Sequence, residues 1–311
     1  MMKAIGINQY GSVDVLEQFN ASMPSIDSNE ILVQTEAFSI NPIDIAVRNG
    51  QFKDSVILLF PTILGTDAVG KIVEVGSKVT DYKVGDEIIA HGIYGAYAEY
   101  FKVTPDKIGL KPKNYDIYEA AGISLSGVTA YNALIRLSHA QEGEKIVVFG
   151  AAGGVGSMLV QMSKAYGLHV IGIDASDEAE FSKNIGVDEF IDKDNKEKID
   201  QIHDADIVID AVGGGLKSNI GINLVKENGT YVSLTNVPQE LYKSKHINVK
   251  VLLYNKEYVD SDAFAAMNLM IRNNQLKTRI NKVVDFDLSE VKKAQQEIET
   301  SKVKGKIIVR I

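Results

Sequence analysis

Small residues at a regular spacing follow an apolar run near the middle of the chain. Ala151, Gly153 and Gly156 fill the three positions of a G-x-G-x-x-G pattern, with alanine at the first position, directly after the run 146–149. Such residues let the backbone turn sharply, approach phosphate oxygens and pack a helix against a strand. The first N–H groups and the positive dipole end of that helix then face an anion. The pattern predicts a pyrophosphate site, to which Gly154 and Val155 also belong.

An acidic residue follows where a dinucleotide needs one. Asp174 closes the apolar run 169–173, and its distance from the glycines is close to the ~20 residues at which an acidic side chain meets the adenosine ribose. The carboxylate would repel a 2′-phosphate, so Asp174 favours NADH over NADPH. Ser176 and Lys193 are further candidates for cofactor binding, and the lysine could pair with a phosphate.

From residue 118 onward the sequence alternates between helical and β patterns. After the glycines a helix is expected over 155–166, ending at Gly167. This alternation predicts an α/β fold with a doubly wound parallel sheet. The expected strands are 146–149, 169–173, 190–191, 206–210 and 230–234, and the other expected helices are 118–137 and 177–185.

Residues 1 to about 118 consist of short β patterns separated by turns, which predicts a partly open β barrel. The tail lacks a nucleotide signal of its own, so we expect it to complete this first domain. The predicted domains are 1–118 with 250–311, and 119–249. Strands are expected at 2–7, 30–37, 69–75, 87–90, 98–103, 249–253, 282–284 and 306–311, and tail helices at 262–274 and 289–300.

Size and composition are those of an ordinary two-domain protein. A chain of 311 residues exceeds what one hydrophobic core usually serves. The absence of cysteine excludes disulfides, thiolate metal sites and a cysteine nucleophile. A net charge of −8 argues against nucleic-acid binding. Without an apolar run near ~20 residues or a basic, apolar leader, we expect no membrane span, no signal peptide and a cytoplasmic location.

The histidines do not form a metal site in the sequence. A catalytic zinc needs three converging His, Cys or acidic ligands. The five histidines are scattered without any i, i+4 pair, so each is expected to be a surface or turn residue. They are His91, His139, His169, His203 and His246.

Motifs along the whole chain resemble the zinc-free quinone oxidoreductase branch of the medium-chain dehydrogenase/reductase superfamily. The resemblance implies a GroES-like catalytic domain, a Rossmann cofactor domain and an active site in the cleft between them. The motifs are Asn41-Pro42-Ile43-Asp44 with Arg48-Asn49-Gly50, Leu64-Gly65-Thr66-Asp67-Ala68-Val69-Gly70, Gly76, Gly85-Asp86, Ser126-Gly127-Val128-Thr129-Ala130, Ala151 to Gly156, Asp210-Ala211-Val212-Gly213 and Gly305-Lys306-Ile307-Ile308.

The same resemblance suggests catalytic residues. Asn41 would lie beside the nicotinamide and the substrate carbonyl, or else only form an Asn-Pro turn. Asp44 and Arg48 are candidates that could equally form an i, i+4 ion pair in the cleft wall, and Asp67 could anchor Arg48 or the turn. Zinc-dependent relatives carry Gly-His-Glu where this chain has Gly65-Thr66-Asp67, so the metal lacks ligands.

Further cofactor and substrate contacts are implied in the same way. Thr129 would contact the nicotinamide ribose or phosphates, and the strand ends at Val212 and Leu234 would line the nicotinamide half. Lys306 would face the cleft, or be solvated as a lysine in a terminal strand. Some relatives have a tyrosine where this chain has Ala46, which leaves the substrate open. Aromatic surface for a flat acceptor could come from Phe52, Tyr94 and Tyr97.

Three functions remain open at this stage. The first is a zinc-independent NAD(P)H-dependent reductase of quinones or similar activated carbonyls, because aligning a nicotinamide with an electron-poor acceptor demands no metal. The second is an enone or enoyl reductase acting on an activated C=C bond. The third is a non-enzymatic NAD(P)-sensing protein. The family prefers NADPH, whereas Asp174 favours NADH. The resemblance also implies a homodimer, which could form through the edge 249–253.

Overall fold

The computed structural model describes residues 1–54, 57–92, 94–215, 217–238, 240, 247–252, 257–300 and 303–311. Two compact units divide the chain. The first comprises Met1–Leu125, Val259–Asn268 and Thr278–Ile311, and the second Ser126–Tyr258 and Leu269–Lys277. No helix among the described residues is both long and apolar enough to cross a membrane.

The unit boundaries differ from the predicted ones after residues 118 and 249. They fall after Leu125 and Tyr258, and a short part of the tail returns to the second unit. A side-chain contact explains that return. The amide of Gln161 donates to the carbonyl of Lys277 at 3.1 Å and accepts its N–H at 2.9 Å.

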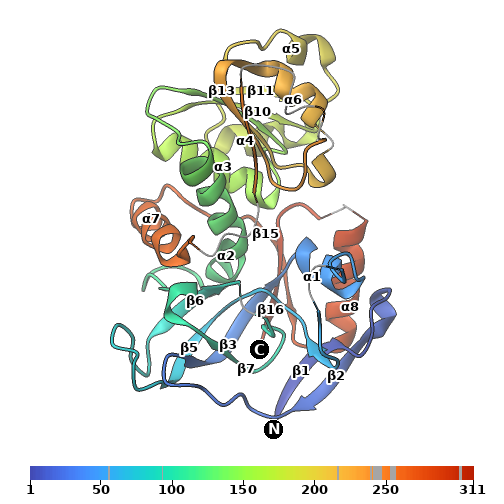
Figure 1. The fold of residues 1–311 in the computed structure, drawn as a ribbon, viewed down its shortest axis with the longest axis vertical. Coiled ribbons are helices and arrows are strands. Elements are labelled where there is room, and N and C mark those ends of the chain that lie inside the picture. Colours follow the sequence, from blue (N-terminus) through green and yellow to red (C-terminus); the bar gives the residue numbers. More distant parts are fainter. Residues whose placement is uncertain are drawn as a thin grey trace. The chain divides into compact units, whose positions relative to one another are not determined.

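The second unit contains a six-stranded sheet in which every neighbouring pair is parallel (Figure 1). Numbered along the chain, its strands lie in the order 3-2-1-4-5-6, which is that of dinucleotide-binding folds. This confirms the predicted doubly wound sheet. The order in space is β11 (Glu189–Asp192), β10 (His169–Asp174), β9 (Lys145–Phe149), β12 (Ala205–Asp210), β13 (Val225–Ser233) and β14 (Asn248–Val251).

Helices follow these strands as the alternation predicts. The apolar residues of β9 are fully buried, as expected for a parallel strand covered on both faces. The predicted helix 118–137 is α-helical only to Tyr131 and ends in a π-helical turn at Asn132–Leu137. The helices of the second unit are α3 (Gly154–Ala165), α4 (Ala179–Asn184), α5 (Lys196–Asp200) and α6 (Ser218–Leu224), with short 3-10 turns at Ser176–Glu178 and Gly213–Gly215. The residues of α2 (Ile117–Tyr131) and α7 (Asp260–Arg272) are divided between the two units.

The first unit is built on two sheets. The larger sheet is mainly antiparallel, and the tail contributes β15 and β16, as predicted. In the larger sheet the order is β15 (Ile280–Asp285), β16 (Lys306–Arg310), β3 (Ile31–Ile40), β5 (Asp67–Val75), β6 (Glu87–His91) and β8 (Ile108–Leu110), and β7 (Tyr100–Val103) also pairs with β3; in the smaller it is β2 (Leu16–Ala21), β1 (Met2–Ile7) and β4 (Thr62–Ile63).

Some elements of this unit were not predicted. Strand β2 reads LEQFNA, and its three polar residues are the three that lie exposed. It therefore lacks the apolar alternation of a half-buried strand. Helix α1 (Pro42–Arg48) follows Asn41 at its N-cap and has proline in its first turn, a helix-start signal that also fits a turn. The remaining elements here are α8 (Leu288–Glu299) and 3-10 turns at Val13–Val15 and Pro105–Lys107.

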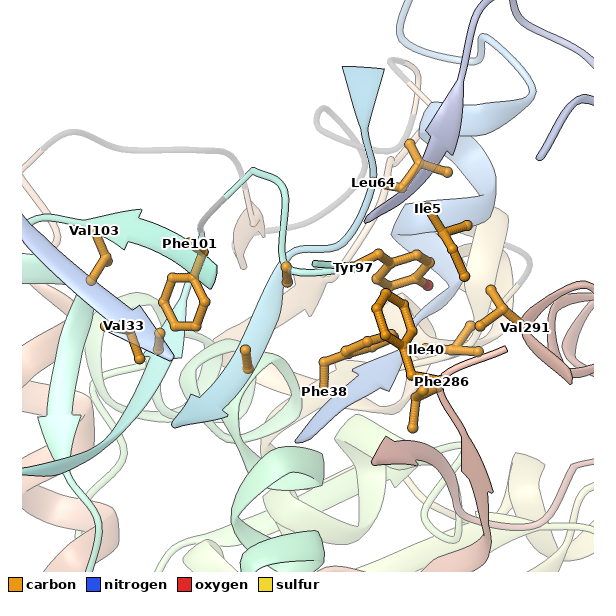
Figure 2. Packing of buried hydrophobic residues seen from close by; sticks show 14 of the residues in the cluster. Ile5, Val33, Phe38, Ile40, Leu64, Tyr97, Phe101, Val103, Phe286 and Val291 are labelled. Atoms are coloured by element: carbon orange, nitrogen blue, oxygen red, sulfur yellow. The ribbon is translucent and has the colours of Figure 1, made fainter. Parts of the chain in front are cut away.

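Three aromatic rings pack together within the mainly aliphatic core of the first unit (Figure 2). The rings of Phe38 and Tyr97 stack with centroids 4.5 Å apart, and Phe286 meets Phe38 edge-on at 5.6 Å. Tyr97 is fully buried, so the prediction that it offers surface to an acceptor is wrong. Its ring belongs to the core, and its hydroxyl donates to the carboxyl of Asp44 at 2.9 Å.

Candidate functional site

The glycine turn after β9 is closed by backbone contacts. Gly150 has a φ of +74°, a conformation that glycine adopts without strain, and its carbonyl accepts the N–H of Gly153 at 3.0 Å. A Cβ on Gly156 would lie 1.8 Å from the carbonyl oxygen of Gly150. Only glycine therefore fits at position 156, and helix α3 starts directly beside the turn. The first N–H groups of a helix have no partner within the helix, so they can bind an anion.

Replacing Gly156 by alanine is expected to open this turn. Because the new methyl group would overlap a backbone atom, the loop must shift, at a cost of about 1–3 kcal/mol in the free energy of unfolding. Dinucleotide affinity, measured by fluorescence titration, is expected to fall at least about tenfold. The control is Ser163→Ala in the same helix, because the Ser163 hydroxyl is buried without a partner. Unchanged affinity in Gly156→Ala would contradict the assignment of the turn.

Asp174 joins two turns at the end of the sheet. One carboxylate oxygen accepts the N–H of Ala152 at 2.8 Å and the other that of Ala175 at 2.8 Å. The half-buried carboxylate is thereby fixed beside the glycine turn. A carboxylate offers about four acceptor positions, so Asp174 can still accept hydrogen bonds from a ribose.

Two of the other predicted cofactor residues lie next to Asp174, and the third lies in helix α2. Lys193 is exposed, and its N–H donates to the carbonyl of Asp174 at 2.8 Å. Ser176 is exposed at the start of its 3-10 turn. Thr129 is half-buried in the last turn of α2.

The strand ends at Val212 and Leu234 are held by a residue that we did not single out. Asp210 is fully buried, and its carboxylate accepts the N–H of Val212 at 3.0 Å and the hydroxyl of Tyr231 at 3.1 Å. Its carbonyl accepts the N–H of Leu234 at 3.2 Å. Burial raises the pKa of Asp210. The signal was its place at the start of the motif Asp210-Ala211-Val212-Gly213, two residues before Val212.

Polar side chains converge in the first unit and are almost completely shielded from water. Asn41 caps α1 and is fully buried, and its N–H donates to the carboxyl of Asp44, three residues on, at 2.8 Å. This is a capping box. We call the set the buried polar cluster; it comprises Ser39, Asn41, Asp44, Asp67, Tyr97 and Lys306.

Asp67 receives hydrogen bonds on both carboxylate oxygens. The hydroxyl of Ser39 donates at 2.9 Å, the side-chain amide of Asn41 at 3.0 Å and the N–H of Leu125 at 3.3 Å. Burial raises the pKa of Asp67, and the charge of Lys306 and the Ser39 hydrogen bond oppose this. Since all three neighbours donate, the geometry suits the ionised carboxylate. Asp67 thus anchors the turn at Asn41, one of the two roles expected of it.

Lys306 supplies the positive charge of the cluster. Its ammonium group donates to the side-chain oxygen of Asn41. Only 8% of the residue is exposed, so the expectation of a solvated lysine is wrong. Burial lowers the pKa of Lys306, and the carboxylates of Asp67 and Asp44 oppose this. The lysine and Asp67 together fix both ends of the Asn41 amide.

Asp44 and Arg48 do not form the ion pair that their spacing suggested. Arg48 is buried and donates to the side-chain oxygen of Gln295 at 2.7 Å, and it forms an ion pair with Glu299. Asp44 instead accepts from the hydroxyls of Tyr97 and Thr66. The ion-pair prediction is therefore wrong, because each group has other partners, and Arg48 joins α1 to α8.

Comparison with known proteins identifies the family. A model described as alcohol dehydrogenase GroES-like domain matches residues 27–113, and one described as zinc-binding dehydrogenase matches residues 154–269. The NADPH-dependent alkenal/one oxidoreductase of Arabidopsis thaliana is 34% identical over 99% of this chain and 79% of its own. The chain belongs to the medium-chain dehydrogenase/reductase superfamily.

Other relatives place it in the zinc-free quinone oxidoreductase branch of that superfamily. The quinone-oxidoreductase homolog of Spinacia oleracea is 31% identical over 99% of this chain and 98% of its own. The solved quinone oxidoreductase of Coxiella burnetii has a TM-score of 0.85 and 28% identity, covering 100% of this chain and 99% of the other. These matches also confirm the GroES-like and Rossmann folds.

The medium-chain dehydrogenase/reductase pattern of zinc ligands does not fit this chain. Zinc in such sites is bound by thiolates, imidazoles and carboxylates, whereas the positions concerned carry Ser39, Asn41, Thr66 and Asp67. The carboxylate of Asp67 is already bonded to its neighbours, and the lysine brings a positive charge to it. No group of three or more potential ligands occurs among the described residues.

The histidines behave differently from one another. His139, His169 and His203 are exposed, as expected. His91 is not a surface residue: it ends β6 half-buried and pairs with the buried carboxylate of Asp260 at 2.9 Å. The same carboxylate accepts from Lys107 at 3.0 Å. His246 lies outside the described residues.

Proposed function

We propose that the protein transfers a hydride from a reduced nicotinamide dinucleotide to a quinone or a similar activated carbonyl compound. The observation that carries this is a closed glycine turn for a dinucleotide in one unit, together with a polar cluster without zinc ligands in the other. Bound NAD(P)H would supply the hydride. The chain itself would hold the pyrophosphate at 151–156, the ribose at Asp174 and the acceptor.

A second candidate is the reduction of an activated C=C bond next to a carbonyl group. The observation that favours it is the alkenal/one oxidoreductase of Arabidopsis thaliana, which the chain resembles over almost its full length. The chemistry differs in one respect, because the carbon next to the carbonyl must receive a proton after hydride addition. The same cofactor geometry serves both reactions.

Steady-state oxidation of NADH and of NADPH, each followed with one simple quinone and one small enone, separates these candidates. Turnover with the quinone supports the first, and turnover with the enone alone supports the second. Cofactor binding without turnover on either acceptor would contradict both and favour a sensing role. The Gly156→Ala variant serves as a control. Its turnover should fall together with its cofactor affinity if the glycine turn binds the cofactor that is oxidised.

We further propose that NADH binds at least as tightly as NADPH, because the carboxylate of Asp174 lies fixed beside the glycine turn. Replacing Asp174 by asparagine removes the charge and keeps an acceptor oxygen, so the affinity ratio of NADPH to NADH should rise about tenfold, equivalent to ~1.4 kcal/mol. Titration of both cofactors measures this. The control is Glu180→Gln, which changes an exposed charge nearby. Wild-type protein that binds NADPH more than tenfold tighter would refute the proposal.

The roles of individual residues remain proposals. Asn41 and Asp44 are our candidates for the acceptor site, and we assign Arg48 to the contact between α1 and α8. Lys306 is assigned to Asn41 rather than to the cofactor. A homodimer could use β14, the last strand of its sheet, although part of the predicted edge, at Leu253, lies outside the described residues. The cytoplasmic location likewise stays a prediction.

A further inference from the structure

The two oxygens of the Asp44 carboxyl have different surroundings. Oδ2 accepts the N–H of Asn41 at 2.8 Å and the hydroxyl of Tyr97 at 2.9 Å. Oδ1 faces the hydroxyl of Thr66 at 3.1 Å. Because two donors already occupy Oδ2, a proton on this carboxyl belongs on Oδ1, from which it points to the oxygen of Thr66.

The hydrogen bond between Asp44 and Thr66 can therefore run in either direction. When the carboxyl is ionised, the hydroxyl of Thr66 donates to it. When Oδ1 carries a proton, the carboxyl donates to Thr66, and the hydroxyl hydrogen of Thr66 is available to another acceptor. Serine and threonine hydroxyls can take both roles at once, which allows a proton to pass through them.

Thr66 is the partner of this carboxyl that reaches the surface. Among the described residues, Asn41, Tyr97 and Thr66 bond to the Asp44 carboxyl, and the first two are fully buried. Thr66 is half-buried. A proton held by Asp44 thus has a path to a bound molecule through the hydroxyl of Thr66.

The charges around Asp44 favour a stored proton. The carboxylate of Asp67 faces it from β5, the ammonium of Lys306 from β16 and the phenol of Tyr97 from the segment before β7. One cation balances one carboxylate. The charge of Lys306 opposes the rise in the pKa of Asp67, and at Asp44 the hydroxyl of Thr66 can reverse its hydrogen bond to accept a proton. Burial, and then the charge of Asp67, raise the pKa of Asp44 to about 7. At neutral pH a large fraction of Asp44 therefore carries a proton.

We propose that Thr66 donates the proton that completes reduction of the acceptor and that Asp44 resupplies it. This rests on the proposed function. Hydride addition leaves the electron pair of the acceptor on an oxygen. The O–H bond of Thr66 then breaks as a new O–H bond forms on the acceptor, and the Thr66 oxygen takes the proton from Oδ1 of Asp44. Water returns a proton to Asp44 along the same path, so the cycle is balanced.

Substitutions of Thr66 test the donor. Thr66→Val keeps the shape and removes the hydroxyl, so kcat should fall about 100-fold, in the range typical of lost general acid catalysis. Thr66→Ser should retain most of the wild-type rate. Cofactor affinity should be unchanged in both. The control is Thr80→Val, which removes an exposed hydroxyl.

Substitution of Asp44 tests the proton store. In wild-type protein kcat should fall as the pH rises through about 7, because the protonated carboxyl resupplies Thr66. Asp44→Asn should be slow at every pH and lose this dependence. Infrared spectra, which need no turnover, should show a carboxylic-acid band that titrates near pH 7 in the wild type and is absent from Asp44→Asn.

The outcomes separate the two proposals. If the wild type reduces neither acceptor, the proposed function fails and the proton path with it. If the wild type is active and Thr66→Val is equally active, the proton path alone fails. The same holds if Asp44→Asn keeps the wild-type pH profile or the titrating infrared band.

Discussion

Replacement of Lys306 by methionine should lower the free energy of unfolding by about 3–5 kcal/mol, the usual loss when one partner of a buried charged pair is removed. Methionine fills a similar volume, so little packing is lost. The carboxylate of Asp67 would then be buried without a neighbouring cation, and the side-chain oxygen of Asn41 would lose its donor. Denaturant unfolding at pH 7 measures the change.

Two further variants show whether charge is the cause. Lys306→Met with Asp67→Asn removes both charges, so the double variant should be more stable than Lys306→Met alone. Lys282→Met breaks the ion pair with Glu297, in which both side chains are about one-third exposed, and should cost less than about 1 kcal/mol. Additive losses in the double variant would show that the lysine stabilises the unit by some means other than its charge.

The cofactor side of the molecule could be predicted because its signals are local. The strand before the glycines, Gly156 and Asp174 all fall within one βαβ unit. The backbone restricts the residue type at both positions. The Gly150 carbonyl leaves no room for a side chain at Gly156, and the carboxylate of Asp174 accepts the N–H of Ala152. Such requirements involve residues close together in the chain, so they appear in the sequence as particular residue types at a fixed spacing.

The buried polar cluster could not be predicted in the same way. Lys306 meets Asn41 across 265 positions of the chain, and Arg48 meets Glu299 across 251. The spacing along the sequence suggested that Arg48 pairs with a residue of its own helix. In the structure Arg48 is buried against α8 and bonds to residues of that helix instead. Tyr97 was misjudged for the same reason, since the stacked ring of Phe38 determines its burial. Tertiary packing overrides local patterns at these positions.

The stability of the wild type should depend on pH through Asp44, and Asp44→Asn should remove that dependence. The pKa of Asp44 is about 7 in the folded protein and about 3.9 in an unfolded chain. Between these values the folded state holds a proton that the unfolded state has released. The contribution of Asp44 is therefore complete below about pH 4 and is lost as the pH rises to 7, by about 4 kcal/mol in all.

Asparagine reproduces the protonated carboxyl at every pH, since its oxygen can accept from Asn41 and Tyr97 while its NH₂ group donates to Thr66. Asp67, Lys306 and Tyr97 are present in both proteins, so the difference in unfolding free energy isolates Asp44. That difference should be small near pH 4 and should grow in favour of Asp44→Asn up to pH 7, with the exposed carboxyl variant Asp81→Asn as the control for net charge. A constant difference across this range would mean that Asp44 is ionised in the folded protein throughout, and that it cannot store the proton assigned to it.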